Sequence, residues 1–370
     1  LYNMMDSIIV GNYVGADALA AVGASSTLTM LFVALATGGS VGASIVISQM
    51  YGAKQIGRMK TAVNTAIISF LVLSLLLTGI GLMLHRQLLV LLATPDTIME
   101  DAALYLRIYF YSFAFLFLFN ACNAVFNALG DSKKPLVFLM ITSVLNVGLN
   151  MLFVIKFSMG VGGVAWATLI AQGVSVLFSL PVLIIKLRRF AADEKPALFN
   201  GGILLKICRV AGPSTLQQSI VSIGLICLQS VVNGFGPSAM AGYTAAGRID
   251  SVTVLPMAAM GTAVSTFTAQ NIGAKKPDRI SKGYVASIKM VLVIGLSVAA
   301  ILFVFGGSLV GFFVEDNFEN AEVIAIGTQY LRVTSAFYFL FGIMNSHSGV
   351  LPYLLSCQFR LPRTRRLYPG

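Results

Sequence analysis

The feature that most constrains this chain is an internal repeat. Residues 12–58 align with residues 233–279 at a constant offset of 221 positions, with no gap. A second match, between residues 105–107 and 330–332, follows at an offset of 225 positions. The sequence therefore predicts two similar structural halves, and any residue that only one half carries stands out.

The amino-acid composition indicates whether these halves fold in water or in a membrane. Hydrophobic residues make up 57% of the chain, charged residues 11%, and the mean hydropathy is +0.86. A soluble domain of 370 residues could not bury so much apolar surface, which indicates a membrane protein. The net charge of +11 does not indicate a nucleic-acid-binding protein, because the basic residues lie between apolar runs and not on one face.

Ten apolar runs are candidates for membrane-spanning helices. The runs are residues 1–13, 25–50, 61–84, 101–128, 135–156, 163–186, 205–233, 239–270, 283–305 and 325–350. They are continuous and not alternating, and helices satisfy their own backbone in lipid, so we expect an all-α polytopic membrane protein. The first run is short and begins without Met, and we interpret it as a clipped helix.

Basic residues predict the orientation of these helices. They concentrate in the connectors after the second, fourth, sixth and eighth runs, whereas the opposite connectors carry few. By the positive-inside rule, the even-numbered helices should end in the cytoplasm. Six helices separate the two copies, so both copies share one orientation and should be related by an axis along the membrane normal. Two such lobes around a central cleft are typical of a secondary transporter.

The same pattern predicts the domain boundaries. We expect an N-lobe over residues 1–186, a polar cytoplasmic linker over 187–202, a C-lobe over 203–350 and a basic tail over 351–370. The tail stands where the repeat calls for two further helices. The sequence thus suggests six helices plus four of an expected six, with truncation at both ends.

The sharpest chemical signal is Asp6, whose repeat partner is Cys227. It lies about 9–10 Å below the predicted outer surface at about 1.5 Å per helical residue. A carboxylate at that depth is costly unless it faces a polar cavity and is protonated or paired, so Asp6 is a candidate proton or cation acceptor. A buried acid with a purely structural hydrogen bond is the alternative.

Three polar residues are expected near Asp6. Asn146 and Asn150 share one helix face, and Thr168 follows in the next span. Counting from the outer turns places Asn150 and Thr168 at similar depths to Asp6 and Asn146 about one turn deeper. Together they suggest an oxygen cage for a hard cation such as sodium, or a network around a titrating carboxyl. Polar contacts that hold helices together are the other reading of the asparagines.

Other polar residues give weaker signals. Asn120, Gln217 and Gln218 are candidate substrate contacts within predicted spans. Asp250 follows Arg248 closely, and we interpret the two as a local surface pair. Enzymatic motifs are absent from the sequence: no phosphate loop occurs, and no catalytic or metal-ligand spacing is present. We therefore expect no enzyme and no cofactor, only a coupling ion, H⁺ or Na⁺.

Several segments resemble the multidrug and toxic-compound extrusion (MATE) family. They are residues 1–3 with Asp6, residues 15–23, residues 49–54 and the echo of the latter at 270–275. The resemblance covers roughly residues 1–350. It implies twelve helices in two six-helix lobes around a cleft, and export of organic cations or amphipathic compounds against sodium or proton influx.

The resemblance also assigns site residues. Members with a cation site in the first lobe use an acid on helix one, an Asn and an Asp four residues apart on helix five, and a Thr on helix six. Asp6, Asn146 and Thr168 match this pattern, whereas Asn150 replaces the second acid. Tyr2 matches a cavity tyrosine of such members. The lost charge favours proton over sodium coupling.

These observations predict a secondary antiporter for small organic substrates, acting as a monomer in a bacterial plasma membrane, with no nucleic-acid partner. Three alternatives remain. A lipid or glycan-lipid flippase of the same superfamily should carry more cationic residues in its cleft. A receptor or scaffold leaves the two-lobe repeat unexplained. A truncated chain that exposes lobe surfaces could be inert.

Overall fold

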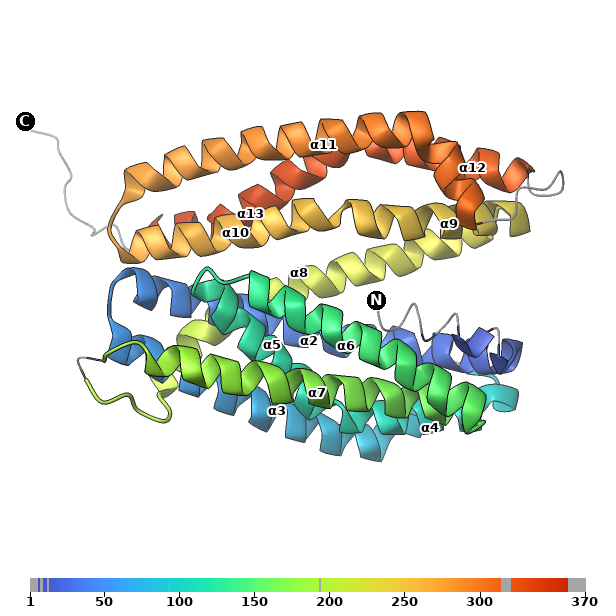
Figure 1. Cartoon of the computed structure of the whole chain (residues 1–370), viewed down its shortest axis with the longest axis horizontal. Helices are drawn as coiled ribbons and strands as arrows, with labels where there is room; N and C mark the ends of the chain where they lie inside the picture. The colour runs from blue at the N-terminus through green and yellow to red at the C-terminus, as the bar shows by residue number, and fades with distance from the viewer. Residues whose placement is uncertain are drawn as a thin grey trace, which may run out of the picture. The chain divides into compact units, whose positions relative to one another are not determined.

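The structure, a computed structural model, describes residues 6, 9–11, 13–92, 94–192, 194–313 and 321–358. The chain divides into two compact units, Leu1–Ser222 and Ile223–Gly370 (Figure 1). The first unit contains α2 (Ala16–Gly52), α3 (Ile56–Leu91), α4 (Asp96–Tyr111), α5 (Phe113–Ala128), α6 (Lys133–Met151), the π-turn η1 (Leu152–Lys156), α7 (Gly160–Arg188) and the start of α8 (Gly201–Asn233). The second contains the rest of α8, α9 (Pro237–Thr253), α10 (Leu255–Gly273), α11 (Pro277–Phe313), α12 (Ala321–Ser335) and α13 (Tyr338–Gln358).

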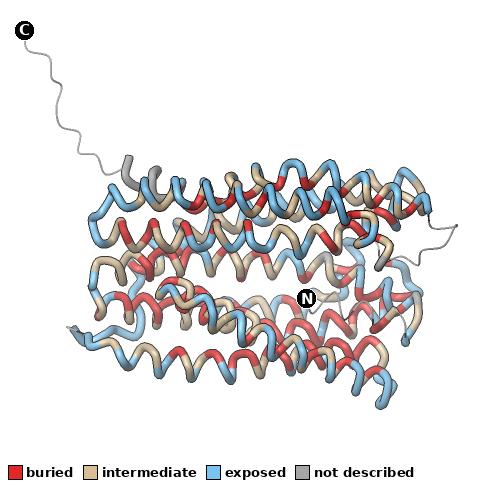
Figure 2. Tube along the Cα trace, turned by 45° about the horizontal axis from the view of Figure 1, so that its top comes forward, coloured by how far each residue is buried: buried red, intermediate tan, exposed pale blue. Residues whose placement is uncertain are grey.

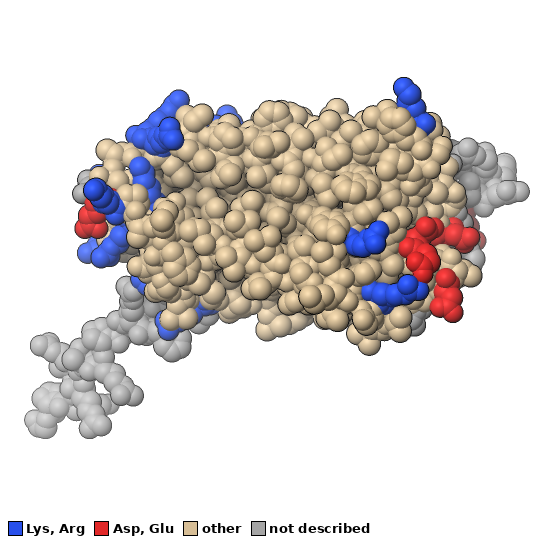
Figure 3. Space-filling model, turned by 90° about the horizontal axis from the view of Figure 1, so that it is seen from below, with Lys and Arg blue, Asp and Glu red and all other residues tan. Residues whose placement is uncertain are grey.

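The helices agree with the apolar runs of the sequence. Seven helical spans in the described part of the chain are long and apolar enough to cross a membrane, or eight if α4 and α5 form one span with a 47° bend. Every expected run after the first lies within one helix or two consecutive ones. The first expected run, 1–13, falls largely outside the described residues. On the face in Figure 3, charged side chains gather toward the helix ends and leave a wide uncharged band between them.

The internal repeat is visible in the backbone. Gly15 and Gly236, at the offset of 221 positions, have φ of 125° and 94°, and each precedes a long helix. Lys54 and Lys275, also 221 positions apart, have φ of 57° and 56°. A residue in this left-handed region is a common way to end a helix. The two halves of the sequence therefore turn the chain at corresponding places.

Aromatic rings from α2, α4 and α5 form the core of the first unit. Phe110, Phe113 and Phe117 are fully buried. Phe32 contacts two of them, with centroid distances of 5.5 Å to Phe110 and 4.9 Å to Phe113. Figure 2 shows buried residues alternating with exposed ones along the helices. The rings lie close to Ser112, where α4 ends and α5 begins, so the bent span is packed against α2 at its break.

Small residues bring α8 against α2. A Cβ atom added at Gly38 would lie 2.6 Å from the Cα of Thr215, and one added at Gly42 would lie 2.8 Å from the Cβ of Ala211. Only glycine fits at such a separation, which explains why the start of α8 groups with the first unit. Residues 203–222 group with the first unit, and the predicted start of the C-lobe at residue 203 stays a prediction.

The linker after α7 is fixed to α3 by hydrogen bonds. The backbone N–H of Ala197 donates to Thr61 Oγ1 at 3.0 Å, and that of Asn200 donates to Thr65 Oγ1 at 3.1 Å. Lys60 Nζ donates to the carbonyl of Phe190 at 2.8 Å. The polar stretch between the predicted lobes therefore lies on α3 along much of its length.

An ion-pair cluster joins the turn after α5 to the end of α7. Asp131 Oδ2 lies 2.5 Å from Lys186 Nζ and 3.1 Å from Lys134 Nζ. Partial burial raises the pKa of Asp131, but the hydrogen bonds and charges of the two lysines outweigh it and hold that pKa below its ordinary value. The cluster connects residues 55 positions apart.

Candidate functional site

Four buried polar side chains form a closed ring of hydrogen bonds in the first unit. Asn150 Nδ2 donates to Asp6 Oδ1 at 2.6 Å, and Thr168 Oγ1 donates to Asp6 Oδ2 at 3.0 Å. Asn146 Nδ2 donates to Thr168 Oγ1 at 3.2 Å, and Asn150 Nδ2 also donates to Asn146 Oδ1 at 3.2 Å. All four side chains are fully buried. The structure thus brings together the four residues that the sequence analysis groups as a cation-coupling site.

Local structure explains why these residues meet. Asn146 and Asn150 lie one turn apart on α6 and so share a face. Directly after α6, residues 152–156 form a π-turn, a feature that is frequent at functional sites. Thr168 lies on α7, about 12 Å along the helix from its start at Gly160. Because α6 and α7 pack together, the amides and the hydroxyl point at one place, where Asp6 completes the ring.

The ring holds a carboxylate that lacks a basic partner among the described residues. The ion pairs of the described chain are Arg86–Glu100, Lys134–Asp131 and Lys186–Asp131. An ionised carboxylate taken out of water costs several kcal/mol unless a charge or a proton compensates it. The two hydrogen-bond donors at its oxygens would offset only part of that cost. The arrangement therefore favours uptake of a positive charge at Asp6.

Two oxygens near the ring are free to accept more. Asn150 Oδ1 and Gln172 Oε1 are buried and have no hydrogen-bond partner among the described atoms. Gln172 lies one turn beyond Thr168 on α7, so it faces the same side. Buried unpaired acceptors are uncommon in folded proteins and indicate room for a proton, a cation or water. Oxygen ligands of this kind suit a hard cation such as sodium, although only one of them is charged.

The sequence analysis missed the aromatic side of this site. Tyr105 and Tyr109 on α4 are almost fully buried, with stacked rings 6.0 Å apart. Tyr109 lies close to Gln172 and Thr29. The spacing of four residues between the two tyrosines, and between Thr168 and Gln172, was the available signal. This signal was hidden because aromatic residues lie on several faces of the helical segment 105–119.

The proposed substrate residues are placed differently. Tyr2 lies outside the described residues. Asn120 is partly buried on α5 and donates to the carbonyl of Leu116 at 2.9 Å. Gln217 and Gln218 are exposed on α8. None of these three described residues belongs to the ring around Asp6, so their role in substrate binding stays a prediction.

In the second unit, Asp250 is bonded to Tyr338 through the tyrosine hydroxyl. The sequence analysis interpreted Asp250 as one member of a local pair with Arg248. Tyr338, on another helix and 88 residues away in the chain, donates to Asp250, and the pair with Arg248 stays a prediction. Helix packing, which a local pattern does not reveal, brings Tyr338 and Asp250 together.

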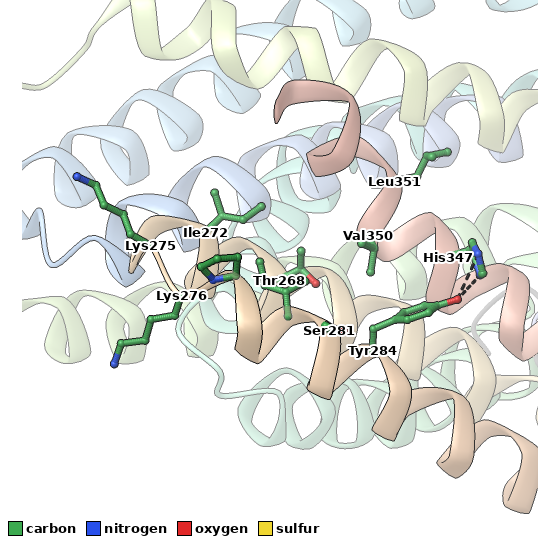
Figure 4. A pocket seen from close by; sticks show the side chains of 11 residues that line it. Thr268, Ile272, Lys275, Lys276, Ser281, Tyr284, His347, Val350 and Leu351 are labelled. Carbon is green, nitrogen blue, oxygen red and sulfur yellow. Dashed lines mark hydrogen bonds between the residues drawn. The ribbon is translucent and has the colours of Figure 1, made fainter. Parts of the chain in front are cut away.

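The second unit also contains a pocket of 520 Å³ between α10, α11 and α13 (Figure 4). Tyr284 and His347 meet across it, with the tyrosine hydroxyl 2.6 Å from the ring Nδ1. The repeat places Val63 and Cys122 at the corresponding positions of the first unit, and both are fully buried there. We therefore interpret the pocket as a packing surface and not as the substrate site.

Comparisons with known proteins agree with the fold. The family model MatE matches residues 1–152 and 213–352. The probable multidrug resistance protein YpnP of Bacillus subtilis is 33% identical over 351 residues, which are 95% of this chain and 77% of YpnP. An FAD transporter of Shewanella oneidensis is 25% identical over 79% of this chain and 65% of its own length.

A solved structure has the same fold. It is the outward-facing conformation of a multidrug resistance MATE family transporter of the MOP superfamily. It superposes with a TM-score of 0.85 at 27% identity, over 97% of this chain and 81% of its own. With its helical spans, its internal repeat and these matches, the chain is a multi-pass membrane protein that belongs to the MATE family of multidrug efflux transporters.

Proposed function

We propose that this protein is a secondary antiporter that exports organic cations and other amphipathic compounds in exchange for protons or sodium. The observation that carries the proposal is the buried ring around Asp6, a carboxylate with donors on both oxygens and no described basic partner. Uptake of a positive ion neutralises the carboxylate of Asp6. The hydrogen bonds that Asn150 and Thr168 donate to it then become weaker. Release of that ion restores the ring.

The ring of hydrogen bonds joins three parts of the N-lobe. Asp6 precedes α2, the asparagines lie on α6, and Thr168 lies on α7. When Asp6 is neutral, the two donors directed at it lose most of their electrostatic gain, because hydrogen bonds to a charged group are about twice as strong as those to a neutral one. The segment that carries Asp6 is then held less tightly. We propose that this segment shifts and changes the substrate contacts of the cleft.

We favour the proton over sodium as the coupling ion. The amide of Asn150 occupies the place where the family pattern has a second acid, and it directs a donor, not an acceptor, at Asp6. A sodium ion would meet a single carboxylate and would have to displace that donor. A proton needs only one oxygen of Asp6.

The names of the relatives support a small-molecule substrate. YpnP is named for multidrug resistance, which suits organic cations, whereas the FAD transporter indicates that an anionic substrate is compatible with this fold. We propose organic cations, carried by a monomer with two lobes in a bacterial plasma membrane. A lipid flippase is the alternative within the superfamily.

Transport in liposomes tests the proposal. The purified full chain is reconstituted, and efflux of ethidium is compared under an imposed proton gradient, an imposed sodium gradient and neither. We expect the proton gradient to drive efflux in the wild type and Asp6→Asn to abolish the response. Asp17→Asn, which removes an exposed acid from the first turn of α2, is the matched control and should behave as wild type. Gradient-driven efflux that survives in Asp6→Asn would remove Asp6 from the mechanism.

A further inference from the structure

One face of α7 carries a polar stripe that begins at the ring of hydrogen bonds and continues along the helix. Its members, Thr168, Gln172, Ser175 and Ser179, follow one another at spacings of four, three and four residues, which puts them on one face. All four are buried. Counted from Gly160, the stripe runs from about 12 Å to about 28 Å along the helix, at about 1.5 Å per residue. Polar residues at such depths in a membrane span are costly and usually serve a function.

Two atoms of the polar stripe have no hydrogen-bond partner among the described atoms. They are Gln172 Oε1 and Ser179 Oγ, and both are buried. Ser175 Oγ, between them, donates at 3.0 Å to the carbonyl of Ala171 on its own helix. Polar side chains that hold membrane helices together form hydrogen bonds across the helix interface. The two unpartnered atoms do not do so, and a buried polar atom without a partner requires an explanation.

The spacing of the stripe suits bound water. Side chains three or four residues apart on a helix have Cβ atoms about 5–6 Å from each other. A water molecule that bridges two polar atoms spans about the same distance, since each of its hydrogen bonds is about 2.8 Å long. One water molecule between each pair of neighbours would therefore give both unpartnered atoms a partner. Buried water in proteins typically occupies such places.

Neighbouring helices supply further polar groups at both unpartnered atoms. α7 packs against α4, α5 and α6, and α6 and α7 run side by side in Figure 1. Tyr109 of α4 lies close to Gln172, and Cys122 of α5 lies close to Ser179. Both neighbours are buried as well. A bound water needs two to four polar partners, and each of the two places offers more than one.

The stripe leads toward the basic end of α7. Lys186 lies seven residues after Ser179 on the same face, and its ammonium group is 2.5 Å from Asp131. Basic residues mark the cytoplasmic ends of membrane spans. Leu183, one turn beyond Ser179, is fully buried and closes this route before it reaches the end of the helix. An antiporter requires such a closure on one side while its site is open to the other.

We propose that Gln172 and Ser179 hold water molecules that carry the proton from Asp6 toward the cytoplasmic end of α7. The proposal rests on the proposed function and specifies how the coupling ion leaves the ring. The O–H bond of protonated Asp6 breaks, and its proton passes to the first water. Each water molecule accepts one proton and passes one on, until the last proton enters cytoplasmic water and Asp6 remains as a carboxylate. Gln172 and Ser179 are positioning residues, because they hold the water and keep their own protons.

Gradient-driven efflux from liposomes tests the path. Ser179→Ala removes a hydroxyl that has no described protein partner, so the variant should fold as wild type. We expect efflux of ethidium under an imposed proton gradient to be about threefold to tenfold slower, which corresponds to the loss of one hydrogen bond from the path. Ser74→Ala is the matched control, because it removes a fully buried hydroxyl of α3 that donates to the carbonyl of Leu71. It should keep the wild-type rate.

A second measurement separates proton transfer from structural damage. Exchange of labelled for unlabelled ethidium is followed in the same liposomes at equal pH on both sides. Exchange moves substrate across the membrane without net proton transfer, so Ser179→Ala should exchange as wild type. Its gradient-driven efflux should slow more in heavy water than that of the wild type, because proton transfer then limits the cycle. Equal losses of exchange and of gradient-driven efflux would overturn the proposal.

A second pair of variants tests the other unpartnered atom. Gln172→Met keeps the length of the side chain but removes its amide, and it should slow gradient-driven efflux and spare exchange. Gln172→Asn keeps an amide oxygen that water can reach, and it should restore most of the rate. Equal losses in Gln172→Met and Gln172→Asn would contradict a role in holding water.

The pattern of results separates this proposal from the proposed function. If Asp6→Asn loses gradient-driven efflux while Gln172→Met and Ser179→Ala keep the wild-type rate, the water path fails and the coupling role of Asp6 stands. If gradient-driven efflux persists in Asp6→Asn, the coupling role itself fails, whatever the other two variants do. Loss of gradient-driven efflux in Asp6→Asn, with slow efflux and normal exchange in the other two, supports both.

Discussion

Replacing Asn150 by Asp tests how the ring selects its ion. In the wild type, Asn150 Nδ2 lies 2.6 Å from Asp6 Oδ1 and 3.2 Å from Asn146 Oδ1, and donates to both. Asn150→Asp removes this donor and places a second carboxylate against the first. At a separation of 2.6 Å and an effective dielectric constant of about 20, two full negative charges repel by roughly 6 kcal/mol.

A repulsion of that size means that the two carboxylates cannot both be ionised without a proton or a cation between them. They must share a proton or hold a cation between them. We expect Asn150→Asp to acquire sodium binding, because two carboxylates with the Thr168 hydroxyl form a better oxygen cage than one. Ligand binding to the folded state raises its stability by mass action, so sodium should raise the melting temperature of the variant.

The assay is thermal unfolding of the full chain in detergent, in sodium chloride or in choline chloride at equal ionic strength. We predict a sodium-dependent rise in melting temperature for Asn150→Asp and none for the wild type. Gln55→Glu, which adds an acid at an exposed position directly before α3, is the control for a general effect of charge. A sodium response of the wild type as large as that of the variant would refute our reasoning about ion choice.

Two further predictions concern packing and pH. Gly81→Leu should destabilise the fold by about 1–3 kcal/mol, because a Cβ atom there would lie 2.4 Å from the buried ring of Phe110. Gly79→Leu, two residues away with open space at its Cβ position, should have little effect in the same thermal unfolding assay, and equal losses would contradict the packing account. The pKa of Asp131 is held below its ordinary value of 3.8, so its bond to Lys186 should stabilise the fold above that pH and lose its effect as the pH falls through the lowered pKa. Asp131→Asn should therefore have a smaller drop in melting temperature between pH 6 and pH 3 than wild type; an equal drop would contradict this.

Much of the fold follows from the sequence because the apolar runs are long and continuous. The runs 25–50 and 61–84 needed no tertiary information, and each lies within a single helix. The break at Ser112 is not visible in the sequence, since the apolar run continues across it. Phe110 before the break and Phe113 after it both pack on Phe32 of α2, a contact that the sequence alone does not reveal.

The two acids show where the site can and cannot be predicted. Depth counting placed Asp6 near Asn150 and Thr168 because all three lie at short distances from recognisable outer turns. The same approach gave no sign of Tyr338, which donates to Asp250 from a helix far along the chain. Counting along one helix gives a depth, but only packing between helices gives a partner.

The central claim is that Asp6 takes up a proton and gives it up when substrate binds. Infrared difference spectroscopy of the full chain tests it directly, by following the carbonyl band of a protonated carboxyl group in wild type and in Asp6→Asn. We predict that this band appears in the wild type on acidification, is missing in the variant, and is lost when ethidium is added at constant pH. A band that ethidium leaves unchanged, or that Asp6→Asn retains at full strength, would contradict the account.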